Sequence, residues 1–131
     1  DLGLIHAAAL VHDMARGKPD HARHGAEILR ELDMPRMAEI VQTHMDLNVE
    51  MEGPIREAEV VFLADKLICE DRFVGIDRRF SPRLQDHHTD PRIEASIRSK
   101  LEFARRSSDR VEAIIGRPLT SLQPPDGPAE P

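Results

Sequence analysis

Apolar residues recur every three to four positions along most of this 131-residue chain, and glycine or proline separates the segments in which they do so. This spacing places apolar side chains on one face of a helix, whereas a half-buried strand needs them at every second position. We find no alternating pattern that favours a strand. The sequence therefore predicts an all-α fold, a compact bundle of about five to six helices.

Residues that start and stop helices set the expected boundaries. We expect helices over residues 2–15, 21–32, 35–45, 54–71 and 90–115. Asp20 and Asp90 are placed as N-caps because an aspartate side chain can accept hydrogen bonds from the first free backbone N–H groups. Gly116 is placed where a glycine commonly ends a helix in the left-handed conformation.

Residue composition predicts where the loops and the C-terminal tail lie. The segments 46–53 and 81–89 are polar and contain turn-forming residues, so we expect exposed loops there. The last residues are rich in proline and poor in apolar side chains, which favours disorder. We therefore expect one helical domain over residues 1–116, as part of a longer protein or without its first helix, and a disordered Pro-rich tail over 117–131.

Charge and cysteine content narrow the class of function. The chain has 18 Lys and Arg against 24 Asp and Glu, a formal net charge of −6, whereas a protein that coats duplex nucleic acid needs a basic face. No apolar run is long enough to cross a bilayer, and Cys69 is the single cysteine, so no internal disulfide can form. We expect a cytoplasmic protein that binds neither duplex nucleic acid nor membranes. Small phosphorylated ligands stay compatible, because a bound metal ion inverts the local field.

Histidine and aspartate occupy the ends or the interior of the apolar segments. His12 and Asp13 end the first segment, His21 opens the second, His44 ends the third, and Asp65 lies inside the fourth. A buried Asp65 needs either a metal ion or an ion pair with an arginine. His12 could bind one ion while Asp13 bridges to a second that His21 and His44 complete. Taken singly, each histidine could be an ordinary helix-end residue; the joint pattern favours a metal site.

The order of these residues resembles the HD superfamily of metal-dependent phosphohydrolases over about residues 4–72. The resemblance is strongest to the bacterial branch with two further histidines before the last aspartate, which includes hydrolases of diadenosine tetraphosphate. It implies an HD-type helical bundle and one or two divalent metal ions, with Fe, Mn, Zn, Mg and Ni not distinguished. The implied metal ligands are His12, Asp13, His21, His44 and Asp65.

Basic residues close to the motif are candidates for phosphate binding. Arg16 stands where the family usually has lysine, and its planar guanidinium could still grip a phosphate. Lys18 and Arg72 are secondary candidates, with a solvated surface cation as the alternative interpretation. Family members also carry a metal-binding histidine on a helix well before the His-Asp pair. Residue 1 is too close to His12 to include it, so we expect that histidine in a preceding part of the protein, or its loss.

Three functional hypotheses follow. The first is a metal-dependent phosphohydrolase that acts on a nucleotide or related phosphate ester or anhydride, with Asp13 and Arg16 as catalytic residues. The second is a catalytically weak HD module that binds a nucleotide and regulates a fused or partner enzyme. The stretch after Arg72 loosely resembles HD modules joined to nucleotidyltransferases of molybdenum-cofactor biosynthesis, which implies a possible fused domain upstream. The third is a helical dimerisation module that uses the last helix and binds no metal.

Overall fold

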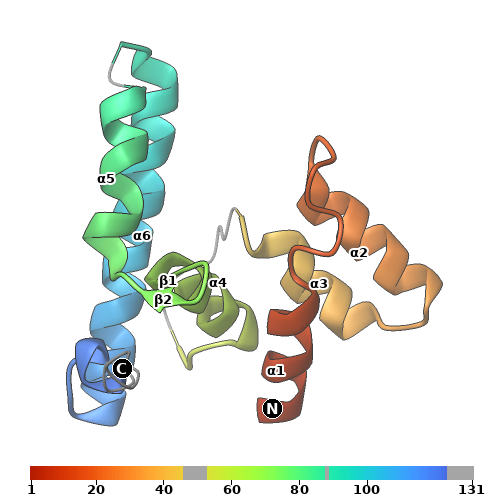
Figure 1. Ribbon diagram of the computed structural model, residues 1–131. Coiled ribbons are helices and arrows are strands. Elements are labelled where there is room, and N and C mark those ends of the chain that lie inside the picture. The colour runs from red at the N-terminus through yellow and green to blue at the C-terminus, as the bar shows by residue number, and fades with distance from the viewer. Residues whose placement is uncertain (46–52, 88, 124–131) are drawn as a thin grey trace, which may run out of the picture. The chain divides into compact units, whose positions relative to one another are not determined.

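A computed structural model describes residues 1–45, 53–87 and 89–123 (Figure 1). Over these residues the α-helices are α1 Leu2–Val11, α2 His21–Glu31, α3 Pro35–Thr43, α4 Glu57–Leu67, α5 Ile76–Asp86 and α6 Pro91–Ile115. The remaining elements are strands β1 Ile68–Cys69 and β2 Arg72–Phe73, which pair antiparallel, and the 3-10 helix η1 Leu119–Leu122. The predicted helical fold is confirmed, and the small sheet is the one departure from it in the described ranges.

The chain divides into two compact units, residues 1–66 and residues 67–131. The first unit holds α1, α2, α3 and nearly all of α4, and the second holds the sheet, α5, α6 and η1. All five predicted metal ligands belong to the first unit, so their arrangement can be described within that unit alone. The expected domain boundary at residue 116 stays a prediction, since this division describes packing and not independent folding.

Two apolar clusters hold the first unit together. One packs α2 on α3 through Ala26, Leu29, Ala38 and Val41. The other joins α1, α3 and α4 through Ala8, Ile40 and Val61. Alanine at the contact positions lets the helix backbones approach closely, and α3 contributes to both clusters. Helix α3 thereby fixes the place of His44, which follows its last residue.

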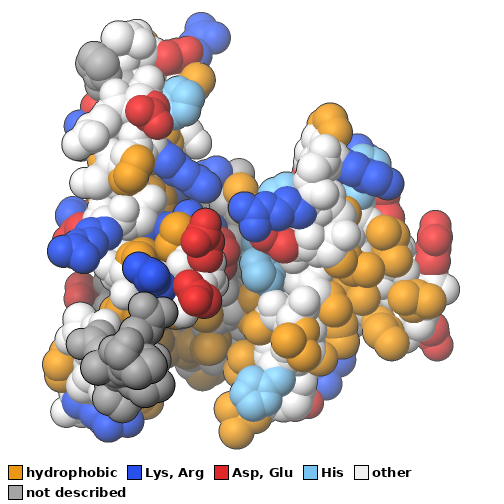
Figure 2. All heavy atoms as spheres, in the orientation of Figure 1, with side chains coloured by type: hydrophobic (Ala, Val, Ile, Leu, Met, Phe, Trp, Pro, Cys, Tyr) orange, Lys and Arg blue, Asp and Glu red, His pale blue; other side chains and the backbone are white. Residues whose placement is uncertain are grey.

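Apolar side chains also reach the surface of the first unit. Figure 2 shows such side chains gathered over α2 and α3. Leu2 and Leu10 on α1 and Leu32 after α2 are more than half exposed. Patches of this kind are common at protein–protein contacts, but scattered exposed leucines are also normal. Whether the chain forms a homodimer, as the third hypothesis implies, is therefore not tested by these side chains.

Helix α1 is shorter than predicted, and this difference shapes the site. It ends at Val11, and residues 12–17 continue as a series of turns. In these turns backbone N–H groups bond to carbonyls three residues back, as between Arg16 and Asp13 at 2.8 Å. Gly17 then adopts a φ of 100°, which favours glycine. His12 and Asp13 therefore lie just beyond the helix end, where their side chains are not confined to the helix surface.

Helix α4 is also shorter than predicted at both ends. It begins at Glu57 and ends at Leu67, where the sequence pattern extended from residue 54 to residue 71. The carbonyl of Leu67 accepts hydrogen bonds from the backbone N–H groups of Val74 and Gly75, which return after the hairpin. This closure ends the helix and starts β1, which is too short for a sequence pattern to reveal.

The predicted exposed loop over residues 81–89 is wrong for most of its length. Helix α5 spans Ile76–Asp86 and contains Pro82 in its interior. Proline removes one helix hydrogen bond, which is why Pro82 favours a loop in the sequence. Phe80 is the buried residue of α5, and the helix packs along α6 within the second unit. Tertiary packing thus maintains a helix that its own sequence favours only weakly.

Other loop and tail predictions fall largely outside the described residues. This is so for residues 46–52 and for residues 124–131. Within the described start of the tail, η1 follows Pro118 and Leu119 is buried. The disordered tail over residues 117–131 stays a prediction. None of the described helices is both long enough and apolar enough to cross a membrane.

Two of the three predicted helix caps are confirmed. The Asp90 carboxylate accepts hydrogen bonds from the N–H groups of the second and third residues of α6, at 3.0 and 3.3 Å. Gly116 ends α6 with a φ of 70°. Asp20 stands at the N-cap position of α2 but has a φ of 53° and makes no capping bond. Its carboxylate accepts from Arg23 instead, at 2.8 Å.

We expect Asp90→Ala to lower the free energy of unfolding by about 1 kcal/mol, the usual effect of losing an N-cap. Asp90→Ser, which keeps an acceptor at the same position, is the matched control, and its free energy of unfolding should fall by only a few tenths of the loss in Asp90→Ala. Urea unfolding of the two variants measures the difference. Equal losses in both would mean that Asp90 contributes through its charge and not through the cap.

Candidate metal centre

Five predicted residues converge from four helix ends of the first unit. His12 and Asp13 follow α1, His21 is the first residue of α2, His44 follows α3, and Asp65 lies in the last turn of α4. Asp13 Oδ1 lies 3.2 Å from His21 Nε2 and 3.5 Å from His44 Nε2. His12 Nε2 lies 3.8 Å from Asp13 Oδ2 and 3.6 Å from Asp65 Oδ1. The structure therefore brings all five together.

The two oxygens of Asp13 face different partners. Oδ1 is turned to His21 and His44, whereas Oδ2 is turned to His12. The nearest ring pairs have centroids 5.0 Å apart for His12 and His44 and 5.3 Å apart for His21 and His44. One ligand atom each from His12, Asp13 and His44 lies within 4.8 Å of the others, a spacing that suits a shared ion. Asp13 is thus the central carboxylate of a three-histidine cluster.

Backbone carbonyls orient two of the imidazole rings. His12 Nδ1 lies 2.7 Å from the Ala9 carbonyl and His44 Nδ1 lies 2.6 Å from the Val41 carbonyl. A carbonyl can only accept, so in both rings Nδ1 carries the donated hydrogen. In the neutral rings Nε2 then carries a lone pair, which points to the carboxylates. Metal-ligating histidines are commonly held in this way, by a hydrogen bond from the other ring nitrogen.

The Nε2 atoms of His21 and His44 fit a metal site on independent grounds. Both are buried and neither makes a hydrogen bond within the described structure. A buried polar atom without a partner is costly. For neutral His44 the cost is larger, because its lone pair faces the carboxylate of Asp13 and two acceptors repel each other. A cation between them removes both penalties, so the residues present fit a divalent metal ion.

Burial and charge affect the ionisation of the cluster. The carboxylate of Asp65 raises the pKa of His12, more than burial lowers it. Burial lowers the pKa of His44, which disfavours a proton on its ring. Burial acts to raise the pKa of Asp65, but His12 and Lys66 together outweigh it and hold that pKa well below its usual range. Asp65 is therefore ionised near neutral pH, with Lys66 and not an arginine as its ion-pair partner.

The three predicted phosphate-binding residues have different surroundings. Arg16 Nη1 lies 3.4 Å from Asp13 Oδ2, and the Arg16 side chain is 80% exposed. It thus stands at the edge of the cluster with donors free for a ligand. Lys18 is exposed and forms no ion pair within the described ranges. Arg72 belongs to the second unit, where it lies 3.8 Å from Asp71. Phosphate binding by all three stays a prediction.

Sequence reasoning missed Lys66. Its side chain is almost fully buried, and its ammonium pairs with the Asp65 carboxylate. The signal was present in the string Phe-Leu-Ala-Asp-Lys-Leu, because a lysine inside an apolar helix needs a compensating partner as much as an aspartate does. Lys66 therefore needs an oppositely charged partner for the same reason as Asp65.

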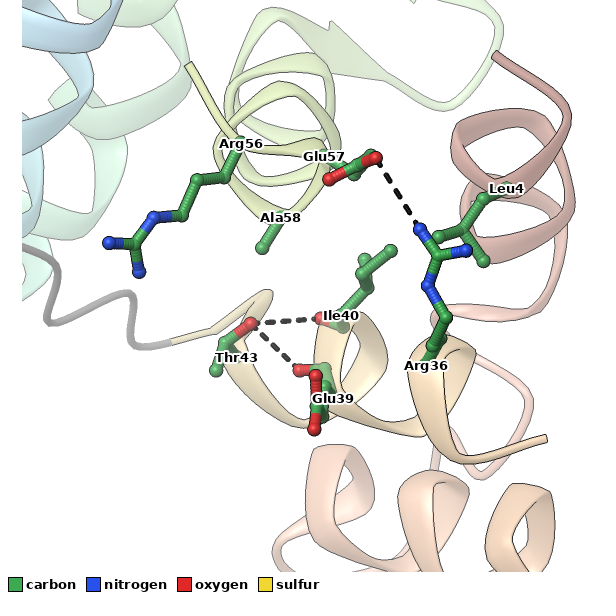
Figure 3. A pocket seen from close by; sticks show the side chains of 8 residues that line it. All are labelled: Leu4, Arg36, Glu39, Ile40, Thr43, Arg56, Glu57 and Ala58. Atoms are coloured by element: carbon green, nitrogen blue, oxygen red, sulfur yellow. Dashed lines mark hydrogen bonds and ion pairs between the residues drawn. The ribbon is translucent and has the colours of Figure 1, made fainter. Parts of the chain in front are cut away.

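A separate pocket of about 250 Å³ lies between α1, α3 and the start of α4 (Figure 3). Arg36 and Glu57 lie 3.8 Å apart in it, and Figure 3 shows Arg56 extending away from that pair. None of the five predicted metal ligands lines it, so this pocket is separate from the histidine cluster.

Comparisons with known proteins agree with this placement. The sequence model of the HD domain matches residues 1–68, which include all five candidate ligands. A curated relative, tRNA (cytidine(56)-2'-O)-methyltransferase from Picrophilus torridus, is 28% identical over 140 aligned residues. The alignment covers 93% of this chain but 38% of that protein, so the chain spans well under half the length of this relative. No solved structure matches the chain significantly.

Proposed function

Since the chain belongs to the HD domain family, we propose that its first unit is a metal-dependent phosphohydrolase acting on a nucleotide or related phosphate ester or anhydride. A divalent ion bound there would supply Lewis acidity and lower the pKa of a water molecule to a useful value. The residues of the chain hold that ion, orient the phosphate and offset its charge. Imidazole and carboxylate ligands are compatible with Fe, Mn, Zn, Mg or Ni and do not select among them.

One observation carries the proposal. The buried Nε2 of His44 faces Asp13 Oδ1 at 3.5 Å, although its Nδ1 already donates to Val41 and leaves Nε2 as an acceptor. Either a proton or a metal ion must lie between the two atoms. Burial lowers the pKa of His44 and so disfavours the proton. A divalent cation is the better occupant.

The geometry supports a division of roles. Two ions would divide the ligands by the oxygen of Asp13 that they face: His12 and Asp65 would hold one, and His21 and His44 the other. A single ion would instead be held by His12, Asp13 and His44, whose ligand atoms lie within 4.8 Å of one another. The extra histidines also favour, as the first substrates to test, the dinucleoside polyphosphates of the branch that this chain resembles.

Arg16 is the first candidate for binding the transferred phosphoryl group. Its guanidinium reaches Asp13 Oδ2 at 3.4 Å while most of its surface stays open to solvent. A planar, permanently charged group in this position can bind two phosphate oxygens and neutralise charge that develops during hydrolysis. Lys18 and Arg72 are secondary candidates for the same role.

The relative is much longer than this chain, which favours a second function, that of a regulatory module attached to a larger enzyme. The stretch that matches this chain is a minor part of a protein named a tRNA methyltransferase. An HD module attached to a larger enzyme could bind a nucleotide and regulate it with little hydrolysis of its own. The comparisons do not speak for a molybdenum-cofactor nucleotidyltransferase as the attached domain. We propose a cytoplasmic protein with a fused or separate enzyme as its partner under this alternative.

Metal analysis combined with turnover tests the two functions. Protein purified without chelator should contain one or two equivalents of a divalent metal ion. It should hydrolyse at least one compound in a panel of nucleotides, dinucleoside polyphosphates and p-nitrophenyl phosphate. EDTA should abolish this activity, and Mn²⁺ or Zn²⁺ should restore it. Metal content without turnover of any compound would favour the regulatory module. Absence of metal, with no binding of added Mn²⁺ or Zn²⁺, would contradict both.

A further inference from the structure

We propose that Lys66 is a positioning residue for the metal centre, which holds Asp65 and the backbone of His44 in the geometry that an ion requires. This inference rests on the proposed function, because it assumes that Asp65 and His44 are ligands. It goes beyond that function by assigning a role to a buried cation that contributes no ligand atom. Lys66 lies in the last turn of α4, directly after Asp65.

Lys66 is a buried charge whose partners compensate for its lost hydration. The residue is 3% exposed. Its Nζ pairs closely with Asp65 Oδ2, lies 3.5 Å from the backbone carbonyl of His44, and stands 5.1 Å from the centre of the Phe62 ring. Removing an ammonium from water is costly unless such partners replace the lost hydration. These partners therefore fix the position of the lysine, and the lysine in turn restricts the positions of Asp65 and of the His44 backbone.

Lys66 selects which oxygen of Asp65 faces the metal centre. The pairing occupies Oδ2, while Oδ1 lies 3.6 Å from His12 Nε2. Without the ammonium, the carboxylate could rotate about its last side-chain bond and present either oxygen, or both, to an ion. The contact thus predisposes Asp65 to bind an ion through a single oxygen. Groups outside the ligand shell commonly orient metal ligands in this way.

The same ammonium connects two ligand-bearing segments. His44 follows α3 and Asp65 belongs to α4, and the hydrogen bond from Nζ to the His44 carbonyl joins them. The imidazole of His44 is separately oriented by Val41. Lys66 therefore fixes the position of the His44 backbone, whereas Val41 fixes the rotation of its ring. Loss of the lysine should loosen the site without removing any ligand.

Titration of the full chain with Co²⁺ tests this role, because visible absorption reports the coordination geometry and calorimetry reports the affinity. Lys66→Met keeps the length of the side chain and removes its charge and donors. We expect its affinity for Co²⁺ to fall about 10- to 100-fold, with a changed absorption spectrum. Lys66→Gln retains one donor for Asp65 and should lose less. Arg30→Met, which removes an exposed cation of α2, is the matched control and should bind as wild type does.

The outcomes separate this inference from the proposed function. If wild type binds no Co²⁺, the metal centre itself is wrong. If wild type binds Co²⁺ and folded Lys66→Met binds it with the same affinity and spectrum, the lysine is merely structural and the inference is overturned. Should Lys66→Met fail to fold, folded Lys66→Gln decides: weaker binding with an altered spectrum supports positioning, and wild-type binding overturns it.

Discussion

Asp13→Ala is expected to abolish divalent-metal binding and hydrolysis while leaving the metal-free fold almost unchanged. The two Asp13 oxygens face His12, His21 and His44, so the substitution removes a ligand from any ion bound in the cluster. The apolar contacts of α1 involve Ala8 and not Asp13. Wild type should be stabilised by about 2.7 kcal/mol when free metal is a hundredfold above its dissociation constant, and this stabilisation should be absent in the variant.

Thermal unfolding with and without EDTA measures that difference. Chelation should lower the midpoint of wild type towards that of Asp13→Ala and leave the variant unaffected. Asp86→Ala, which removes an exposed carboxylate from α5, should respond to EDTA as wild type does. An equal response to EDTA in Asp13→Ala and wild type would mean that Asp13 is no ligand.

Asp65→Ala is expected to destabilise the protein even without metal, by about 3–5 kcal/mol, because it leaves the ammonium of Lys66 buried without its carboxylate. The pKa of Asp65 is lowered in the folded protein, so its ionisation favours folding. This contribution is fully present above the pKa of an unfolded aspartate, about 4, and is lost as pH falls below that value. The difference between wild type and variant should therefore shrink in acid.

Urea unfolding in EDTA at several pH values measures this effect. The double variant Asp65→Ala/Lys66→Met removes the uncompensated ammonium and should recover much of the lost stability without recovering metal binding. A loss below about 1 kcal/mol in Asp65→Ala at neutral pH would contradict a tightly coupled buried pair and place the ammonium in contact with solvent.

The fold was predictable where apolar spacing and capping residues agree. Helix α6 begins at the cap that Asp90 provides and ends at Gly116, both recognisable from local chemistry. Helix α5 was not predictable, because Pro82 opposes it and Phe80 is its one buried residue among those described. The hairpin of β1 and β2 was also missed, since two-residue strands leave no periodic pattern.

The metal centre was predictable in its membership but not in its details. The joint pattern of His12, Asp13, His21, His44 and Asp65 favoured one site, although each histidine alone could be an ordinary helix-end residue and the sequence could not give the distances. The partner of Asp65 was expected to be a metal ion or an arginine, whereas Lys66 forms the ion pair. Neighbouring residues of a helix usually point apart, so this pairing depends on rotamers that only the packed structure determines.

Crystals of the full chain grown or soaked with Mn²⁺ would locate a bound ion through its anomalous scattering. We expect a peak beside Asp13 within coordination distance, about 2.0–2.3 Å, of His44 Nε2 or His12 Nε2. A second peak on the other side of the carboxylate would establish a bridging role for Asp13. If the protein folds and crystallises with the histidine cluster intact, yet shows no peak there at millimolar Mn²⁺ or Zn²⁺, the cluster is no metal centre.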